Sequence, residues 1–536
     1  MPQVSESTQK LISRYQNWHQ SLQPKEGITT IHVDEVASRV AAFYEKIRGI
    51  IDWKEEHLLK RGAIERILKR RIFSKLLSEG VISSSVIAEP LVLELIRGGH
   101  LPNDQVPESR INEVQKIIDK YVFIVNNTSY YRKKSRIQLY SWISGIAACE
   151  IEEILSPAIK ERALISYMFE IINQKIELDQ KIKITEQEKN NQTYIAVQRA
   201  LFNLDSPVIN YHLLKYRYPE WENLDSEQLK TITKNIHLIK NDLEKHLNHP
   251  LGDKFYAICE KYDTSFLLLG DVLSKNPMEA KEKISNPELL EVSIIAHYNQ
   301  RVKTLKKRLG RAAFYSTLSI FLTNVISLFI IEIPFNKWVT GYFFNYWAIT
   351  IDIAGPTLLM FLSVITIRPP EKENLPRVLM EIMKIVYDKG KKDVYKIRRL
   401  KKRNIVFEAI INLFYFLGFG AILFLVVWSL YQVNFPPLSY IIFIVFLSLI
   451  AFAGTKIRQR AKELQVIEKK ETSLYFLVDP FALPIIQLGK WLTNKWKRYN
   501  IIAVFFSALI DMPFTVFVEF IEQWRYFLKE KKEKIH

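Results

Sequence analysis

The chain has 536 residues, of which 48% are hydrophobic and 25% are charged, and its formal net charge is +18. A mean hydropathy of -0.03 in so charged a chain indicates that polar and apolar residues are segregated into separate parts. The two cysteines, Cys149 and Cys259, exclude a disulfide framework and a cysteine-rich zinc site. The excess positive charge suits either nucleic acid or the anionic inner surface of a membrane, and its location decides between them.

Residues 1–300 are polar, with apolar residues at helical spacing, as in the segment 36–51. Asp34, and either Asp225 or Ser226, fit N-cap positions ahead of such segments. Alternating apolar and polar runs are scarce, so the pattern predicts an all-α domain made of one or two helical bundles. The first 27 residues contain no apolar core after basic residues, so we expect no cleavable signal and a cytoplasmic location for this domain.

Four apolar segments follow a basic collar that begins at Arg301. They cover residues 312–331, 346–367, 405–431 and 438–455, and each is long enough for a transmembrane helix. We expect Glu332, Pro334 and Lys337 to end the first span. The predicted domains are therefore 1–300, a cytoplasmic helical domain; 301–367, the collar and spans one and two; 368–404, a basic cytoplasmic loop; 405–456, spans three and four; and 457–536, interfacial or re-entrant helices with a basic tail.

The basic residues lie on one side of these spans. The loops after spans one and three contain one basic residue and none, whereas the loop after span two ends in "KIRRLKKR" and span four leads into "KIRQRAKELQVIEKK". The positive-inside rule then places both termini and the long loop in the cytoplasm, in the cell inner membrane. Attraction to anionic lipid, at about 1 kcal/mol per basic residue, accounts for this charge, so nucleic acid is not required as a partner. The residues predicted to lie at the lipid surface are Lys306, Lys307, Arg308, Arg398, Arg399, Lys401, Lys402, Arg403, Lys495, Lys497 and Arg498.

Two further apolar stretches, 474–492 and 501–524, each contain an Asp/Pro site and have basic flanks on both sides. A full span would place one flank outside, so we expect re-entrant or interfacial helices on the cytoplasmic face. The predicted helix breaks are Asp479-Pro480, and Asp511 with Pro513, where Asp511 caps a half-helix that begins at Pro513. The amphipathic segment 516–528 fits a helix at the membrane surface.

Polar residues inside the predicted spans are the main candidates for a functional site. Asp352 lies about 9 Å along the second span, just before Gly355-Pro356, which can break a helix and free carbonyl groups. It is either an ion or proton site, or a polar residue near the interface that is paired within the bundle or neutralised, since a carboxylate at this depth is costly. The other candidates have simpler interpretations: Glu332 as an interface residue, Glu408 as part of a local ion pair with the preceding basic residues, and Asn324 and Asn412 as buried amides that join helices.

Other chemistry has little support in the sequence. His246 and His249 are three residues apart in a predicted helix, and such a pair is only a weak metal signal. No phosphate-binding loop, H-E-x-x-H or G-x-S-x-G motif is present. We therefore expect no enzymatic activity and no cofactor.

The phrases "IEIPFNKWVTG", "SVITIRPPEKEN" and "FVEFIEQWRYFLKEKKEKI" resemble those of uncharacterised multi-span membrane proteins of small-genome bacteria. The resemblance covers mainly the C-terminal half and implies no activity.

Two functions remain open. The first is a structural or scaffolding membrane protein that assembles with itself or with a partner through its cytoplasmic domain. The second is an oligomeric channel or transporter that uses Asp352 and the Gly355-Pro356 break.

Overall fold

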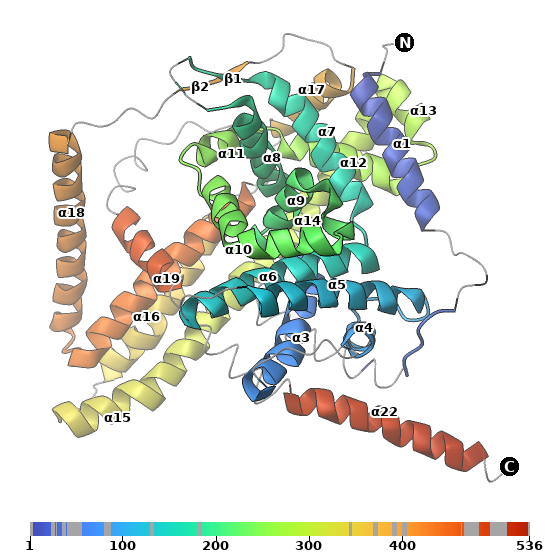
Figure 1. Cartoon of the computed structure of the whole chain (residues 1–536). Helices are drawn as coiled ribbons and strands as arrows, with labels where there is room; N and C mark the ends of the chain where they lie inside the picture. The colour runs from blue at the N-terminus through green and yellow to red at the C-terminus, as the bar shows by residue number, and fades with distance from the viewer. Residues whose placement is uncertain are drawn as a thin grey trace. The chain divides into compact units, whose positions relative to one another are not determined.

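The computed structural model is mostly helical (Figure 1) and describes residues 4–22, 29–34, 56–79, 87–128, 133–180, 184–341, 346–367, 373–387, 394–398, 405–462, 482–493 and 512–533, with a few single residues between them. The chain divides into two compact units. The N-terminal unit comprises 3–282 together with 390–398 and 505–536. The membrane unit comprises 283–389 and 399–504, with residues 1 and 2. The boundary predicted at residue 300 falls inside a continuous helix.

The N-terminal unit is a set of packed helices. In chain order they are α1 (Glu6–Ser21), α3 (Glu56–Glu79), α4 (Ala88–Arg97), α5 (Ser109–Asn127), α6 (Lys133–Leu155), α7 (Ile159–Lys175), α8 (Glu186–Phe202), α9 (Ser206–Arg217), the short 3-10 helix η1 (Pro219–Asn223), α10 (Ser226–Leu247), α11 (Gly252–Glu260), α12 (Asp263–Lys275) and α22 (Met512–Glu533). The helix α13 (Ala280–Ser285) lies at the boundary between the two units. One large apolar core joins α3, α4, α5, α6, α8, α9 and α10.

Local sequence signals explain where several of these helices begin. The Asp225 side chain accepts hydrogen bonds from the backbone N–H groups of Glu227 and Gln228. The Gln228 side chain accepts a hydrogen bond from the Asp225 backbone in return, which completes a capping box. The prediction of an N-cap at Asp225 is therefore confirmed. The helix start predicted after Asp34 lies outside the described residues, although Asp34 itself is described.

Two short strands modify the all-α prediction. Strand β1 (Ile176–Leu178) pairs in parallel with β2 (Tyr395–Ile397), with Ile176 opposite Tyr395. Each strand has three residues, too few to show a period-two pattern in the sequence. The pairing assigns part of the predicted basic loop to the N-terminal unit. Arg398, one of the predicted lipid-surface residues, follows β2, and its backbone carbonyl accepts a hydrogen bond from the Lys254 ammonium.

Within the described residues, four helices are long and apolar enough to cross a membrane, as the sequence predicts. They cover Pro287–Val339, Tyr346–Ile365, Val406–Gln432 and Pro437–Ala461. The membrane unit contains α14 (Pro287–Ser327), the π-helical turn η2 (Leu328–Glu332), α15 (Ile333–Phe335), the π-helical turn η3 (Asn336–Thr340), α16 (Tyr346–Ile365), α17 (Asn374–Tyr387), α18 (Ile405–Gln432), α19 (Pro437–Ala461) and a helix over 482–493.

The first span does not end where the sequence predicts. Glu332, Pro334 and Lys337 lie inside one helical run that begins at Pro287 and reaches Thr340. The π-helical turns on either side of Pro334 let the chain continue despite the missing proline N–H. Gly341, with a φ of 65°, ends the run in the left-handed conformation typical of a helix C-terminus.

The helices α14, α16 and α19 pack against one another (Figure 1). Their apolar contacts include Met360 and Val364 of α16 with Ile450 and Ile457 of α19. Gly355 permits a close approach here, because a Cβ at this position would lie 3.3 Å from the Phe443 ring.

By contrast, α18 is exposed along most of its length, and only 6% of its most apolar stretch is buried. Its last turn contributes Leu430 to a small cluster with Ala348, Phe435 and Phe443. Among the described residues, the membrane unit thus contains three candidate spans that pack together and one, α18, that is mostly exposed.

Candidate functional site

A group of buried polar side chains lies where α14, α16 and α19 meet. The apolar composition of these spans makes the polar residues conspicuous, because polar groups in a membrane interior need partners. The members with 0% exposure are Asn324, Glu332, Asn336, Asp352 and Ser439. Two of the five carry carboxyl groups.

Asp352 is the least compensated member of the group. Its side chain is fully buried, and within the described part of the chain neither carboxyl oxygen has a hydrogen-bond partner. The interpretation of Asp352 as a residue paired within the bundle is therefore not supported. Leaving a buried carboxyl group without a donor is unfavourable, and such groups in membrane spans mark ion or proton sites.

The backbone around Asp352 is also unusual. In a regular helix its carbonyl would accept from the N–H of residue 356, but that residue is a proline and has no N–H. The carbonyl accepts instead from the side-chain amide of Asn324 on α14. The helix α16 nevertheless continues through both Gly355 and Pro356, so the predicted break at these residues is wrong. The prediction that the proline frees a carbonyl group, in contrast, describes this contact well.

Glu332 is fully buried and lies within the same group. Its carboxyl group accepts hydrogen bonds from Ser327 (3.1 Å) and from Ser439 of α19. Its backbone carbonyl accepts from the Asn336 amide, at 2.9 Å. Glu332 ends the π-helical turn η2, and such turns are frequent at functional sites.

The two carboxyl groups belong to one site. Asn324, which holds the Asp352 carbonyl, and Ser327, which donates to Glu332, are three residues apart on α14 and therefore lie on one helix face. The Asn324 amide oxygen is also buried and has no hydrogen-bond partner among the described residues.

This arrangement offers oxygen atoms to a small cation or a proton. Asp352 supplies two carboxyl oxygens, Asn324 an amide oxygen, and Glu332 a second carboxyl group already held by two hydroxyl donors. Oxygen ligands suit hard cations, and a single carboxyl group without a donor also suits a proton. In the described residues no group of three or more His, Cys, Asp and Glu side chains is placed to hold a metal ion.

The remaining intramembrane candidates lie outside this group. Glu408 and Asn412 are exposed on α18, so the prediction of a buried amide at position 412 is wrong for the single chain. The basic residues expected to pair with Glu408 lie outside the described residues. Asn324, in contrast, is buried, and its side-chain amide joins α14 to α16.

The predicted lipid-surface and helix-break residues are only partly described. Lys306, Lys307 and Arg308 are exposed on α14, and Arg398 is exposed after β2. Arg399, Lys401, Lys402, Arg403, Lys495, Lys497, Arg498, Asp479, Pro480 and Asp511 lie outside the described residues. Pro513 lies in the first turn of α22, which begins one residue before the predicted start.

His246 and His249 have separate protein partners. His246 contacts Arg217 at 2.6 Å, and His249 lies 3.4 Å from the carboxyl group of Glu188. Each ring is thus engaged by a different helix of the N-terminal unit, and the two do not share one ligand set.

Sequence reasoning missed Ser327, Asn336 and Ser439 as members of the site. The available signal is the occurrence of small hydroxyl or amide residues inside long apolar segments, where they commonly join helices. Their partners could not be identified, because the register between α14 and α19 depends on the continuous helix through Pro334.

No family model, no curated protein and no solved structure matches this chain.

Proposed function

We propose that this chain is a membrane channel or transporter that binds a proton or a small monovalent cation at Asp352. The observation that carries the proposal is the fully buried Asp352 carboxyl group, whose two oxygens have no donor within the described residues. A bound proton or cation would supply the missing compensation. Glu332, held by Ser327 and Ser439, is a second oxygen donor near the same position.

The proposed orientation places the N-terminal unit and the C-terminus in the cytoplasm, with the protein in the cell inner membrane. Support comes from the basic residues beside the spans, including the exposed Lys306, Lys307 and Arg308. These side chains suit an anionic inner leaflet. The aromatic residues Trp338 and Trp347, both strongly exposed, lie near the ends of the spans that the rule assigns to the outside.

Four spans enclose little space, so we also propose that the functional form is a homo-oligomer or a membrane complex. The exposed surface of α18 supports assembly, because Asn412 on this span is exposed in the part of the chain that the structure describes. A polar amide in a membrane span is more stable when another helix provides a hydrogen-bond partner.

A structural or scaffolding role is the second candidate function. It is favoured by the large helical N-terminal unit, whose continuous apolar core extends over seven α-helices. In this role the four spans would anchor the unit, and Asp352 would have no ligand.

The test is ion flux in liposomes that contain the purified full-length protein. Each experiment would impose a gradient of H⁺, Na⁺ or K⁺ and follow it with an ion-sensitive dye. We expect the wild-type protein to pass one of these cations and Asp352→Asn to abolish the flux. Glu408→Gln is the matched control, since it removes a carboxyl group that is exposed on α18.

The outcomes separate the two functions. Flux that survives Asp352→Asn would show that the site is assigned wrongly. If the wild-type protein passes none of the three cations, the scaffolding function is favoured instead.

A further inference from the structure

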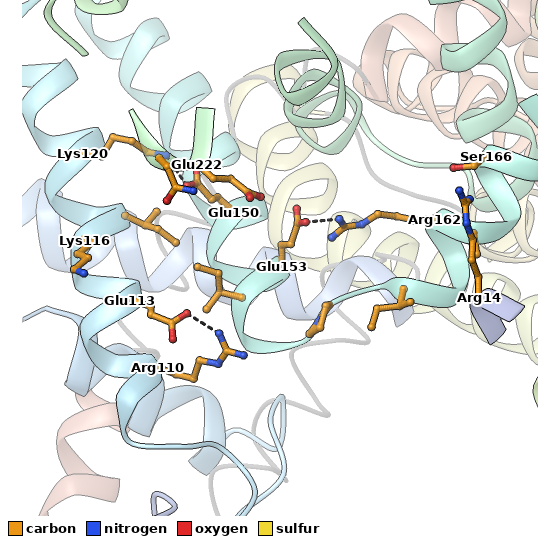
Figure 2. A pocket seen from close by; sticks show the side chains of 16 residues that line it. Arg14, Arg110, Glu113, Lys116, Lys120, Glu150, Glu153, Arg162, Ser166 and Glu222 are labelled. Atoms are coloured by element: carbon orange, nitrogen blue, oxygen red, sulfur yellow. Dashed lines mark hydrogen bonds and ion pairs between the residues drawn. The ribbon is translucent and has the colours of Figure 1, made fainter. Parts of the chain in front are cut away.

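A cleft with a volume of about 850 Å³ opens in the N-terminal unit (Figure 2). Residues from α1, α5, α6, α7 and η1 line it, all of them within that unit. The volume lies in the range of sites that hold small organic ligands. None of the residues that line the cleft belongs to the intramembrane polar group.

Each carboxyl group in the lining is already paired with a cation. Glu113 pairs with Arg110 at 2.6 Å, and Glu150 pairs with Lys120 at 2.5 Å. Glu153 pairs with Arg162 and with Lys215, and Glu222 also pairs with Lys215. The negative charge of the cleft is thus neutralised by the protein itself.

Two cations in the lining remain after this pairing. Among the described residues, neither Lys116 of α5 nor Arg14 of α1 forms an ion pair with an acidic side chain. Figure 2 shows them at opposite ends of the cleft, Lys116 beside Glu113 and Arg110, and Arg14 beside Ser166 and Arg162. The cleft therefore presents uncompensated positive charge at both ends.

The wall between the two ends is partly apolar. The apolar residues of the lining are Ile117, Ile154, Pro157, Ile159 and Ala163. A ligand that carried only charge would leave this wall uncovered, whereas the carbon skeleton of an organic molecule would cover it.

Buried polar contacts join two of the lining residues, Glu150 and Lys120, to Tyr121 and Trp221. Glu150, only 2% exposed, accepts from Lys120 and from the Tyr121 hydroxyl at 2.6 Å. The Trp221 indole N–H donates to the same hydroxyl at 3.0 Å, and the Trp221 carbonyl accepts from Lys120. A satisfied network of this kind fixes the positions of the lining side chains before a ligand binds.

We infer that this cleft binds a small organic anion that carries negatively charged groups at both ends, such as a bisphosphate or a polycarboxylate. Lys116 and Arg14 bind the two charged groups, and the isoleucine side chains contact the carbon skeleton. This site is independent of the cation site proposed at Asp352.

The test is isothermal titration calorimetry on the full-length protein in detergent, with three probes: inorganic phosphate, citrate and fructose 1,6-bisphosphate. We expect saturable binding of citrate or fructose 1,6-bisphosphate, and weaker binding of inorganic phosphate. Lys116→Gln and Arg14→Gln should each weaken the binding of the organic anion about tenfold, the effect of losing one charge-assisted contact.

Lys234→Gln is the matched control, because Lys234 is an exposed basic residue of α10 outside the cleft. It should leave the affinity unchanged. An unchanged thermal unfolding midpoint in all three variants would show that the substitutions do not disturb folding. The inference is overturned if neither organic anion binds saturably below about 10 mM, or if the control variant weakens binding as much as the two cleft variants.

Discussion

The two units of this protein bury carboxyl groups in opposite ways. In the N-terminal unit, Glu150 is 2% exposed, but one oxygen accepts from the Lys120 ammonium and the other from the Tyr121 hydroxyl. In the membrane unit, Asp352 is 0% exposed and neither oxygen has a donor within the described residues. The side chains are nearly the same chemically, so the difference lies in what the surrounding helices supply.

The comparison separates structural from functional burial of charge. A carboxyl group with all its donors in place is part of the folded architecture, and removing it leaves its partner uncompensated. A buried carboxyl group without donors does not stabilise the fold in this way, so its presence in the interior requires another explanation. For Asp352 we propose a bound proton or cation as that explanation, and the predictions below test each side of the contrast.

The largest expected effect on stability comes from removing Glu150, the buried carboxyl group that has hydrogen-bond donors. Glu150→Ala should lower the free energy of unfolding of the N-terminal unit by about 3–5 kcal/mol, because it leaves the mostly buried Lys120 ammonium without its counter-charge. Denaturant unfolding followed by circular dichroism measures this. Glu177→Ala is the control, since the Glu177–Lys396 pair is 3.9 Å apart with both side chains more than half exposed, and should cost about 0–1 kcal/mol. A Glu150→Ala protein as stable as the control would contradict the assignment of Glu150 as structural.

Glu152 offers a pH-dependent test in the same unit. Burial raises the pKa of its carboxyl group from 4.5 to about 7. The folded protein then binds this proton more tightly than the unfolded chain does. The resulting stabilisation of the folded state is fully present below pH 4.5 and is lost as the pH rises to 7. Glu152→Gln should therefore be more stable than the wild-type protein by about 3 kcal/mol at pH 8, and equally stable at pH 4.

The wild-type pH profile alone is not a sufficient measurement of this effect. Burial also lowers the pKa of His212, to about 4, which acts in the opposite direction between pH 4 and 6.5. The difference in unfolding free energy between Glu152→Gln and the wild-type protein cancels the histidine contribution. A difference that does not change with pH would show that Glu152 titrates normally in the folded state.

A smaller effect is expected at the backbone beside Asp352. Asn324→Ala should destabilise the membrane unit by about 1–3 kcal/mol, because it removes the donor to a buried carbonyl group that Pro356 has freed. Pro356→Ala restores a backbone N–H at this position of α16. In the Pro356→Ala protein, Asn324→Ala should therefore lower the free energy of unfolding by less than about 0.5 kcal/mol. Thermal unfolding of the wild-type protein, the two single variants and the double variant measures the coupling between Asn324 and Pro356. Equal costs in the two backgrounds would show that the amide and the proline act independently.

The smallest effect on stability is expected at Asp352 itself. Asp352→Asn keeps the shape of the side chain and removes a charge that no described donor compensates. Measured without added cation, its thermal unfolding should match or slightly exceed that of the wild-type protein, by about 0–1 kcal/mol. A loss as large as that of Glu150→Ala would mean that Asp352 has structural partners, and would remove the contrast between the two units.

The sequence supports the number of spans well, because each apolar segment alone meets the length of a bilayer. It also identifies Asp352 and Asn324, since a polar residue stands out in an apolar segment. It fails at Glu332, because the charge and proline at 332–334 suggest a helix end, whereas two π-helical turns carry the helix onward. The donors to Glu332 come from both α14 and α19, and such pairing between helices depends on their relative register.

The N-terminal unit shows a related limit. Helical periodicity predicts its helices, and a capping box is readable at Asp225. The pairing of β1 with β2 joins residues more than two hundred positions apart through three-residue strands, which have no detectable period. The cleft likewise depends on which charges of α5, α6 and α7 face one another, and helical spacing within each segment does not determine that.

The most direct test of the cation site is the dependence of thermal stability on cation concentration. The full-length wild-type protein and Asp352→Asn would be unfolded in lipid nanodiscs while H⁺, Na⁺ or K⁺ is varied, with choline holding the ionic strength constant. A ligand that binds only the folded state stabilises it by about 2.7 kcal/mol at one hundred times its dissociation constant. We predict that one of the three cations raises the unfolding midpoint of the wild-type protein by more than it changes that of Asp352→Asn, because groups such as Glu152 and His212 respond to pH equally in both proteins. Parallel curves for the two proteins with all three cations would contradict the account.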